Sequence, residues 1–508
     1  MNQKGFAPLI LIIIVTVIVA VAGGGVWYYK QSAEQNKSVS GTQATPGSSS
    51  TPVVPEPSSS KPSPTPTEQP KQTDQKAVPK TPASTNIPTS TKEIPYPSAP
   101  EISCTSPTDT AHMDIFDSHA HVNPKVSTSQ IISKMDRAGV SVTNLYSISL
   151  DTASQYTGRF IAFVDTPDSS PNWLSQGQSF LTSAETQLKT GKYSGIGETN
   201  LRYYSGKLIP PPTVYVPADT PLWLQLVDLS AQYHVPISFH FVPDDSVANA
   251  AFERMLEHNK DAILIWAHLG FNNMTLNSAT LGDYLLRYPH LYFDTAGIQN
   301  MQQDPGPQTN SNWWMLTSQG DNGRLNEEWK KFFETWNSRI LFGSDAGGGG
   351  NGMERWLNYM DDSVKGATPD AIGHWRNLLS NMDPNAALNI LSGNAKELFL
   401  KKQKKPYSYS VPSSGTCYTI SVRSESSVSA LTFNQSTRAI TFTVADSNGT
   451  TGNAVITIPT ALGKNFTASV DGQGVKSQVT SDSTNTTVSV TYQGGIRSVT
   501  LTAPKTPQ

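Results

Sequence analysis

The sequence is poor in cysteine and in charged residues. Two cysteines in 508 residues are too few for a disulfide-stapled scaffold or for a cysteine-ligated zinc finger. Charged residues make up 15% of the chain, compared with the roughly 25% that is usual for soluble globular domains. The 37 basic and 40 acidic side chains leave a net charge of −3. The chain therefore lacks the basic surface of a nucleic-acid-binding protein, and we expect no nucleic acid partner.

One long uncharged run lies near the N-terminus. Residues 6–29 contain 24 positions without a charge, more than the roughly 20 apolar residues that cross a bilayer as a helix. Aromatic residues and Lys30 follow the run, as expected at a membrane interface, which predicts a single-pass transmembrane anchor within residues 1–30. The alternative is a cleaved signal segment, because Ala20-Val21-Ala22 resembles a small-residue cleavage site. Both interpretations place the rest of the chain outside the cytoplasm, either at the cell membrane or secreted.

The next segment lacks the residues that build a hydrophobic core. Fourteen of the 36 prolines lie within residues 31–100, and no aromatic residue lies between Tyr29 and Tyr96. Such a segment cannot bury enough apolar surface to offset the entropy lost on ordering. We therefore predict a disordered linker, which would act as a stalk through a cell wall if the anchor is retained.

Residues 101–403 alternate short apolar runs with helical patterns. Eight runs have the length of strands, and they lie at residues 113–121, 140–148, 159–165, 193–198, 235–240, 262–268, 290–296 and 339–345. Eight strand–helix units over about 290 residues predict a (β/α)8 TIM barrel, a fold of the α/β class. A doubly wound open sheet is the competing architecture, but it rarely contains eight such units.

Side chains that ligate metals stand at the ends of five of these runs. They are His119 and His121 in the first run, followed by Glu198, His240, His268 and Asp345. In a parallel barrel the C-terminal strand ends meet at one mouth, where active sites form. Because alternate strand residues point to the same side, the two histidines of the first run can bind one ion. A lone histidine on an apolar strand is usually a core residue, but this set predicts a metal centre.

Several motifs resemble the amidohydrolase superfamily of metal-dependent hydrolases, and together they cover residues 113–400. DSHAH is similar to the family's first-strand His-x-His, and YSGIGETNLRYY resembles the fourth-strand Glu motif of TatD-type hydrolases. ILFGSDAG looks like the eighth-strand Asp motif, and ILSGNAKELF resembles the closing helix of the amidohydrolase-related branch. TatD-type enzymes usually have Gly and Asp where Asn200 and Arg202 stand, so the resemblance does not extend to nucleic acid as the substrate.

The resemblance implies one or two divalent metal ions at the barrel mouth. The residues for the first ion would be His119, His121 and Asp345, those for the second would be His240 and His268, and Glu198 would bridge the two. With a single ion, His240 would join the first set and His268 would polarise the substrate. Zinc is the default metal for nitrogen and oxygen ligands without cysteine, and Mn, Fe, Co or Ni are the alternatives.

The chemistry implied by such a centre is hydrolysis. A divalent ion lowers the pKa of its bound water from 15.7 to about 7, so a metal-bound hydroxide would attack a carbonyl or phosphoryl centre of a small substrate. Asp345 would accept the proton and pass it to the leaving group. Two alternatives remain: a metal-dependent decarboxylase of the amidohydrolase-related branch, whose mononuclear sites lack a bridging Glu, and a non-catalytic surface protein that uses the barrel to bind a ligand.

Residues 299–324 form a long segment on the predicted catalytic side of the barrel. A loop of this length is uncommon in a compact domain unless it is functional, so we predict a substrate-binding lid that contains Trp313 and Trp314. Packing of the two tryptophans on the barrel is the alternative. Arg202, which follows Glu198 by four positions, is the third residue that we predict to bind substrate.

Residues 404–508 lack histidine and tryptophan and contain short runs of alternating apolar and polar residues. Asn-Gly, Asp-Gly and Gly-Gly pairs at 448–449, 471–472 and 494–495 are typical of turns between antiparallel strands. We predict an antiparallel β-sandwich, which would be structural or would attach the protein to a cell wall or surface.

The two cysteines flank the predicted barrel. Cys104 precedes its first strand, and Cys417 lies at the start of the predicted sandwich. Because the first and eighth strands of a barrel are neighbours, its entry and exit segments can lie close together. Cysteines of exported proteins tend to be oxidised, so we predict a disulfide between Cys104 and Cys417.

Overall fold

The computed structural model describes residues 104, 108–167, 170–203, 212, 214–243, 245–270, 277–298, 316, 323–347 and 371–504. The predicted anchor, the predicted linker, and most of the predicted lid with Trp313 and Trp314 lie outside these residues. Across the ranges just given, no helix is both long enough and apolar enough to cross a membrane.

Eight parallel strands form a closed ring. They are β1 (Ile115–His121), β2 (Val140–Tyr146), β3 (Phe160–Ile161), β4 (Ile196–Tyr203), β6 (Ile237–Phe241), β7 (Leu264–Trp266), β8 (Leu291–Asp294) and β9 (Ile340–Leu341). Strands pair in the order β1-β2-β3 and β4-β6-β7-β8-β9. Parallel bridges join Val164 to Ile196 and Ala120 to Ala346, and these two bridges close the ring. The strand pairing itself therefore gives the predicted eight-stranded parallel barrel.

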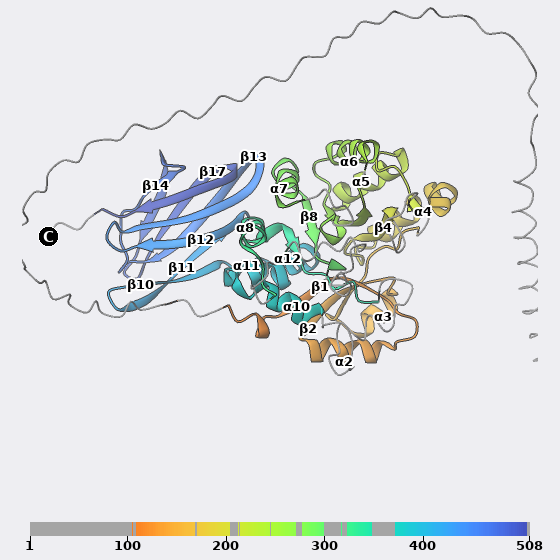
Figure 1. Ribbon diagram of the computed structural model, residues 1–508, viewed down its shortest axis with the longest axis horizontal. Helices are drawn as coiled ribbons and strands as arrows, with labels where there is room; N and C mark the ends of the chain where they lie inside the picture. Colours follow the sequence, from red (N-terminus) through yellow and green to blue (C-terminus); the bar gives the residue numbers. More distant parts are fainter. Residues whose placement is uncertain are drawn as a thin grey trace, which may run out of the picture. The chain divides into compact units, whose positions relative to one another are not determined.

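Helices alternate with these strands along the chain (Figure 1). Those between strands are α2 (Thr128–Ala138), α3 (Leu150–Gln155), α4 (Ser170–Lys189), α5 (Pro221–Tyr233), α6 (Ser246–His258), α7 (Ser278–Arg287) and α8 (Glu327–Thr335), and those after β9 are α10 (Ala371–Leu378), α11 (Pro384–Leu388) and α12 (Asn394–Leu400). Several of these helices are capped at their N-terminus by a side chain. Ser127, Asp245 and Asn326 each accept a hydrogen bond from a backbone N–H of the first turn, which has no partner within the helix. The largest side chains of the barrel core are fully buried, including Trp173, Trp223, Trp266, Trp329 and Trp375.

The C-terminal part of the chain is antiparallel. Its strands are β10 (Tyr407–Ser413), β11 (Thr416–Ser424), β12 (Ser427–Asn434), β13 (Ala439–Pro459), β14 (Thr467–Val470), β15 (Gln473–Val475), β16 (Ser477–Ser481) and β17 (Asn485–Thr502). The long strands β13 and β17 pair almost from end to end. One half of this pair also carries β12 and β14, and the other half carries β11 and β16. Apolar side chains of both halves share one buried cluster, which is the two-layer packing expected of a sandwich.

Two of the three predicted turns in this part are wrong. The pairs at 448–449 and 494–495 lie inside β13 and β17, where the register of the two strands shifts. A Cβ at Gly494 would lie 1.9 Å from the carbonyl oxygen of Ser447, so glycine permits the close backbone approach at this bulge. The third pair, 471–472, does connect β14 to β15 as a two-residue turn.

The antiparallel sheet contacts the barrel just before β9. The residues involved form η5 (Asn337–Arg339), in which the backbone N–H of Ser338 donates to Oγ of Ser427 at 2.9 Å. Arg339 donates from Nη2 to Oγ of Ser447 at 3.0 Å. Cys104 and Cys417 form a disulfide with a Cα–Cα separation of 5.7 Å, within the limit of about 7 Å for such a bond. The segment before β1 is therefore tied to β11.

Candidate metal centre

The six predicted ligand side chains converge at the mouth of the barrel. Five strands of the ring position them: β1 carries His119 and His121, β4 carries Glu198, β6 carries His240, and the turns after β7 and β9 carry His268 and Asp345. The side chain of His119 is fully buried, whereas that of His121 is 26% exposed and that of Asp345 is 16% exposed. The cluster is therefore reachable from the side of His121 and Asp345.

Three donor atoms of this cluster, from His119, His121 and Asp345, surround one position, and an oxygen of Glu198 lies beside it. Nε2 of His119 lies 3.2 Å from Nε2 of His121 and 3.4 Å from Oε2 of Glu198. Oδ1 of Asp345 lies 3.4 Å from Nε2 of His121 and 3.9 Å from Nε2 of His119. Donors about 2.0–2.2 Å from a tetrahedral ion lie about 3.3–3.6 Å from one another. The ligand atoms of His119, His121 and Asp345 all lie within 4.8 Å of one another, which suits a shared divalent cation.

The other carboxylate oxygen of Glu198 faces a second position. Oε1 lies 3.6 Å from Nδ1 of His240 and 3.3 Å from Nε2 of His268. It is buried and has no hydrogen-bond partner in the described ranges of the chain. A buried anionic oxygen without a donor is costly, and a cation between it and the two imidazoles would remove that cost. The ligand atoms of Glu198 and His268 also lie within 4.8 Å of that of His119, and a set of three donors leaves room for water or substrate, as catalytic metal sites do.

Two of the histidine rings make a hydrogen bond through Nδ1, on the side that faces away from the cluster. Nδ1 of His119 lies 2.9 Å from Oδ2 of Asp294, and Nδ1 of His268 lies 2.7 Å from the carbonyl oxygen of Ala296. Asp294 was not among the predicted site residues. The signal that could have identified it is its position at the end of the apolar stretch of β8, where other strands of the ring carry ligands.

A second buried carboxylate, Asp117, joins β1 to the turn after β9. Its Oδ1 accepts from the backbone N–H of Ser344 at 2.9 Å and from that of His119 at 3.2 Å, and its Oδ2 accepts from Oγ of Ser344. Burial raises the pKa of Asp117 to about 6, although the hydrogen bonds from Ser344 oppose the rise. Asp117 therefore ties together the backbones that carry His119 and Asp345 without contacting either imidazole ring of β1.

The buried charges of the cluster are strongly coupled. Burial alone would lower the pKa of His119, but the charges of Asp294 and Glu198 outweigh burial and hold this pKa well above its ordinary value. Burial alone would raise the pKa of Glu198, but His119 and the other imidazoles around it hold this pKa well below its ordinary value. A carboxylate that stays ionised in a buried site is suited to bind a cation.

The remaining ligand groups follow the same pattern. Burial would raise the pKa of Asp345, but His121 and His268 lower it to about 2. Burial lowers the pKa of His240, so this ring is neutral and able to bind a metal at neutral pH. Burial would also lower the pKa of His268, but Glu198 raises it.

Two of the ligands lie beyond the strands that were predicted to carry them. β7 ends at Trp266 and β9 ends at Leu341, so the predicted strand ends at His268 and Asp345 are wrong by two and four residues. Both residues have left-handed backbones, with φ of 60° and 57°. L-residues adopt this conformation at a cost, and it turns both side chains back over the mouth of the barrel.

Arg202 lies beside the cluster and not within it. It belongs to the extension of β4 that pairs with β5 (Val214–Tyr215). Its Nη2 donates to Oδ2 of Asp245 at 2.8 Å, and its guanidinium carbon lies 4.7 Å from the centre of the Tyr215 ring. The neighbouring Tyr203 ring packs edge-on against His240 with centroids 4.9 Å apart. A role for Arg202 in substrate binding stays a prediction, as do those of Trp313 and Trp314.

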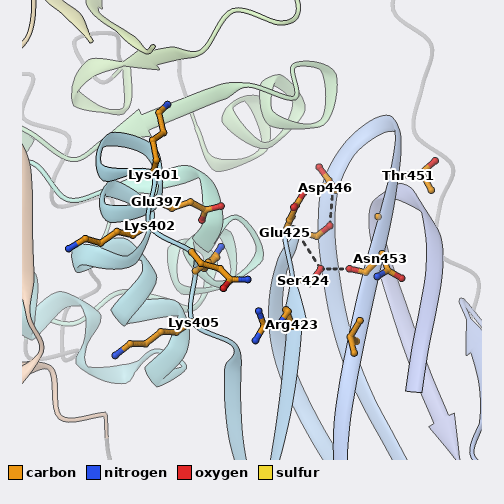
Figure 2. A pocket seen from close by; sticks show the side chains of 15 residues that line it. Glu397, Lys401, Lys402, Lys405, Arg423, Ser424, Glu425, Asp446, Thr451 and Asn453 are labelled. Atoms are coloured by element: carbon orange, nitrogen blue, oxygen red, sulfur yellow. Dashed lines mark hydrogen bonds between the residues drawn. The ribbon is translucent and has the colours of Figure 1, made fainter. Parts of the chain in front are cut away.

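A separate cavity of about 610 Å³ lies between the end of the barrel and strands β11 and β13 (Figure 2). Lysines of the segment after α12 line it together with Arg423 and Asn453. Figure 2 shows that the ammonium groups of Lys402 and Lys405 point away from these strands, out of the cavity. None of the six candidate ligands lines this cavity, so it plays no part in the metal centre.

The comparisons with known proteins add little beyond the geometry. No family model and no curated protein matches the sequence. A 2,6-dihydroxybenzoate decarboxylase is 12% identical, with 57% of this chain and 98% of that chain covered and a TM-score of 0.33. A putative amidohydrolase from Staphylococcus aureus is 13% identical (56% and 99% covered, TM-score 0.31), and a TatD homologue from Escherichia coli is 13% identical (56% and 98% covered, TM-score 0.34). The barrel is therefore assigned from its own strand pairing, and the metal centre from its own distances.

Proposed function

We propose that the chain is a metal-dependent hydrolase of the amidohydrolase type that acts on a small molecule. The observation that carries this proposal is the placement of Glu198. One of its oxygens faces His119 and His121, and the other faces His240 and His268, at 3.3–3.6 Å in every case. A carboxylate in this position can bridge two cations, which favours a hydrolytic centre over a mononuclear decarboxylase.

The side chains of such a centre would have separate chemical roles. A bound divalent cation, with zinc the default for these donors, would supply Lewis acidity and lower the pKa of a nearby water. Asp345 is ionised and reaches the open side of the cluster, so its carboxylate would accept the proton of the attacking water and return it to the leaving group. His268 would orient the substrate's reacting carbonyl or phosphoryl oxygen at the second position. With a single ion, the proposed binding set would be His119, His121, His240 and Asp345.

We also propose that this centre works outside the cytoplasm. The proposal is supported by the uncharged run at residues 6–29 and by the proline-rich segment that follows it. The disulfide between Cys104 and Cys417 is typical of oxidising compartments. The antiparallel module after residue 404 would then attach the protein to a cell wall or surface, or brace the barrel.

The test is metal analysis of the full chain followed by a panel of ester, lactone, amide and phosphoester substrates. We expect about two zinc ions per chain and hydrolysis of at least one class. Asp345→Asn keeps the shape of the side chain but cannot accept a proton, so turnover should fall by about 10²- to 10⁴-fold. Asp228→Asn, on the outside of α5 beside His258, is the matched control and should keep full activity. Release of CO₂ from carboxylate substrates without hydrolysis, or near-full turnover of Asp345→Asn, would contradict the proposal.

A further inference from the structure

Asp294 contacts ligands of both halves of the proposed metal centre. Its Oδ2 lies 2.9 Å from Nδ1 of His119. Its Oδ1 accepts from the backbone N–H of His268 at 2.8 Å and from that of Ala296 at 3.0 Å. Asp294 is 1% exposed and lies behind His119 as seen from the open side. It therefore acts through the ligands, and it does not touch a substrate.

These contacts fix which nitrogen of His119 carries the ring proton. The two backbone donors on Oδ1 hold the carboxylate in one orientation and leave Oδ2 to face the imidazole. An ionised carboxylate can only accept, so Nδ1 of His119 must donate. Nε2 of the neutral ring is then left with its lone pair, and this nitrogen faces His121 and Glu198. The partner behind a metal-binding imidazole selects its tautomer in this way.

The same strand end also orients His268. Asp294 binds its backbone N–H, and the carbonyl oxygen of Ala296 accepts from its Nδ1 at 2.7 Å. Nε2 of His268 is therefore also the nitrogen with the free lone pair, and it faces Glu198. The backbone contact further supports the left-handed conformation of His268, which has φ of 60°.

We propose that Asp294 is the positioning residue that couples the two metal positions, because it sets the tautomer of His119 and the backbone of His268 at once. The proposal rests on the metal centre described above, but not on its being hydrolytic. β8 contributes no ligand of its own to the cluster, and this role gives its C-terminal end a function.

Asp294→Asn tests the proposal with an isosteric change. The amide oxygen should keep the two backbone N–H donors, because turning the amide over would set its NH₂ group against both of them. The NH₂ group then faces Nδ1 of His119, which must become the acceptor, and the ring proton moves to Nε2. A nitrogen that carries a proton cannot bind a metal. Zinc affinity should therefore fall by at least the roughly 10- to 100-fold typical of lost supporting contacts.

The measurements are nitrogen-15 NMR of the histidine rings in the full chain and zinc affinity by competition with a chelator. In zinc-loaded wild-type protein we expect the proton of His119 on Nδ1. In metal-free Asp294→Asn at alkaline pH we expect it on Nε2. Asp117→Asn is the matched control, because it also replaces a fully buried carboxylate, here within β1, but should leave the proton of His119 on Nδ1.

The outcomes separate this inference from the proposed function. Wild-type zinc affinity in Asp294→Asn, or a Nδ1 proton on His119 in that variant, would overturn the role of Asp294. A wild-type spectrum without a Nδ1 proton on His119 would overturn it as well, even if the variant failed to fold. A wild-type protein that binds zinc with the expected tautomers but hydrolyses nothing would contradict the proposed function alone.

Discussion

Gly297 allows the end of β8 to pass close to two ligands, and its replacement tests how tightly the metal centre is packed. Its φ is +69°, and a Cβ there would lie 3.1 Å from Nδ1 of His268 and 3.2 Å from Oδ2 of Asp345. These distances are shorter than normal van der Waals contact, so in Gly297→Ala both ligands must shift by a few tenths of an ångström. Gly191 is the matched control, because its φ is +66° and a Cβ there would meet nothing within 4 Å.

Both variants should lose stability, but only one should lose metal affinity. A left-handed L-residue costs about 1–2 kcal/mol, and alanine recovers about 0.4–1 kcal/mol by restricting the unfolded chain, so Gly191→Ala should lose about 1 kcal/mol and Gly297→Ala, which also crowds two side chains, at least as much. Only Gly297→Ala displaces ligands, and its zinc affinity should fall by about 10- to 100-fold. Denaturant unfolding of the metal-free protein and chelator competition measure the two effects. Equal zinc affinity in Gly297→Ala and Gly191→Ala would refute the reasoning.

Two further predictions concern the metal ions themselves. Glu198→Gln should bind one zinc ion in place of two. The first position keeps His119, His121 and Asp345, whereas the second keeps only two imidazoles. Two zinc ions per chain in the mass spectrum of this variant would contradict a bridging role. Raising the pH through the elevated pKa of His119 should lower the stability of the metal-free protein, since the folded chain binds this proton more tightly than the unfolded chain does. Over the same pH range zinc affinity should rise, because zinc competes with that proton. If stability and zinc affinity changed with pH in the same direction, a group other than His119 would control binding.

The ring of strands and the convergence of the six ligand side chains were predictable from the sequence. Buried parallel strands are continuous apolar runs, and a polar ligand type at the end of such a run is conspicuous. The histidines of β1 and Glu198 of β4 lie within their strands, so the alternation of strand side chains and the order of the strands are enough to place them at the mouth of the barrel. Asp294 also ends an apolar run, but the supporting roles of Asp294 and Asp117 could not be assigned from the sequence, because their partners come from distant strands.

The antiparallel module shows where local patterns mislead. Asn-Gly and Gly-Gly pairs favour tight turns, but at 448–449 and 494–495 they sit opposite each other in β13 and β17. Two glycine-containing pairs that face each other across a ladder produce a bulge, and the paired strands bend there between the two layers. Only the pairing partner distinguishes a bulge from a turn, and that partner lies more than forty residues away in the sequence.

Two ligands were predicted from the sequence but their backbone conformations were not, and the reason is the same for both. His268 and Asp345 adopt left-handed backbones shortly beyond short strands, a conformation that is uncommon for any residue with a side chain, although His and Asp adopt it more often than most. Such strain persists only where the surroundings determine it. Here Asp294 binds the backbone N–H of His268, and the backbone N–H of Asp345 donates to the carbonyl oxygen of His119 at 2.8 Å. The cost of each turn is offset by contacts that exist only once the ring has closed, so the ligand geometry is a property of the assembled barrel and not of the segments that carry the ligands.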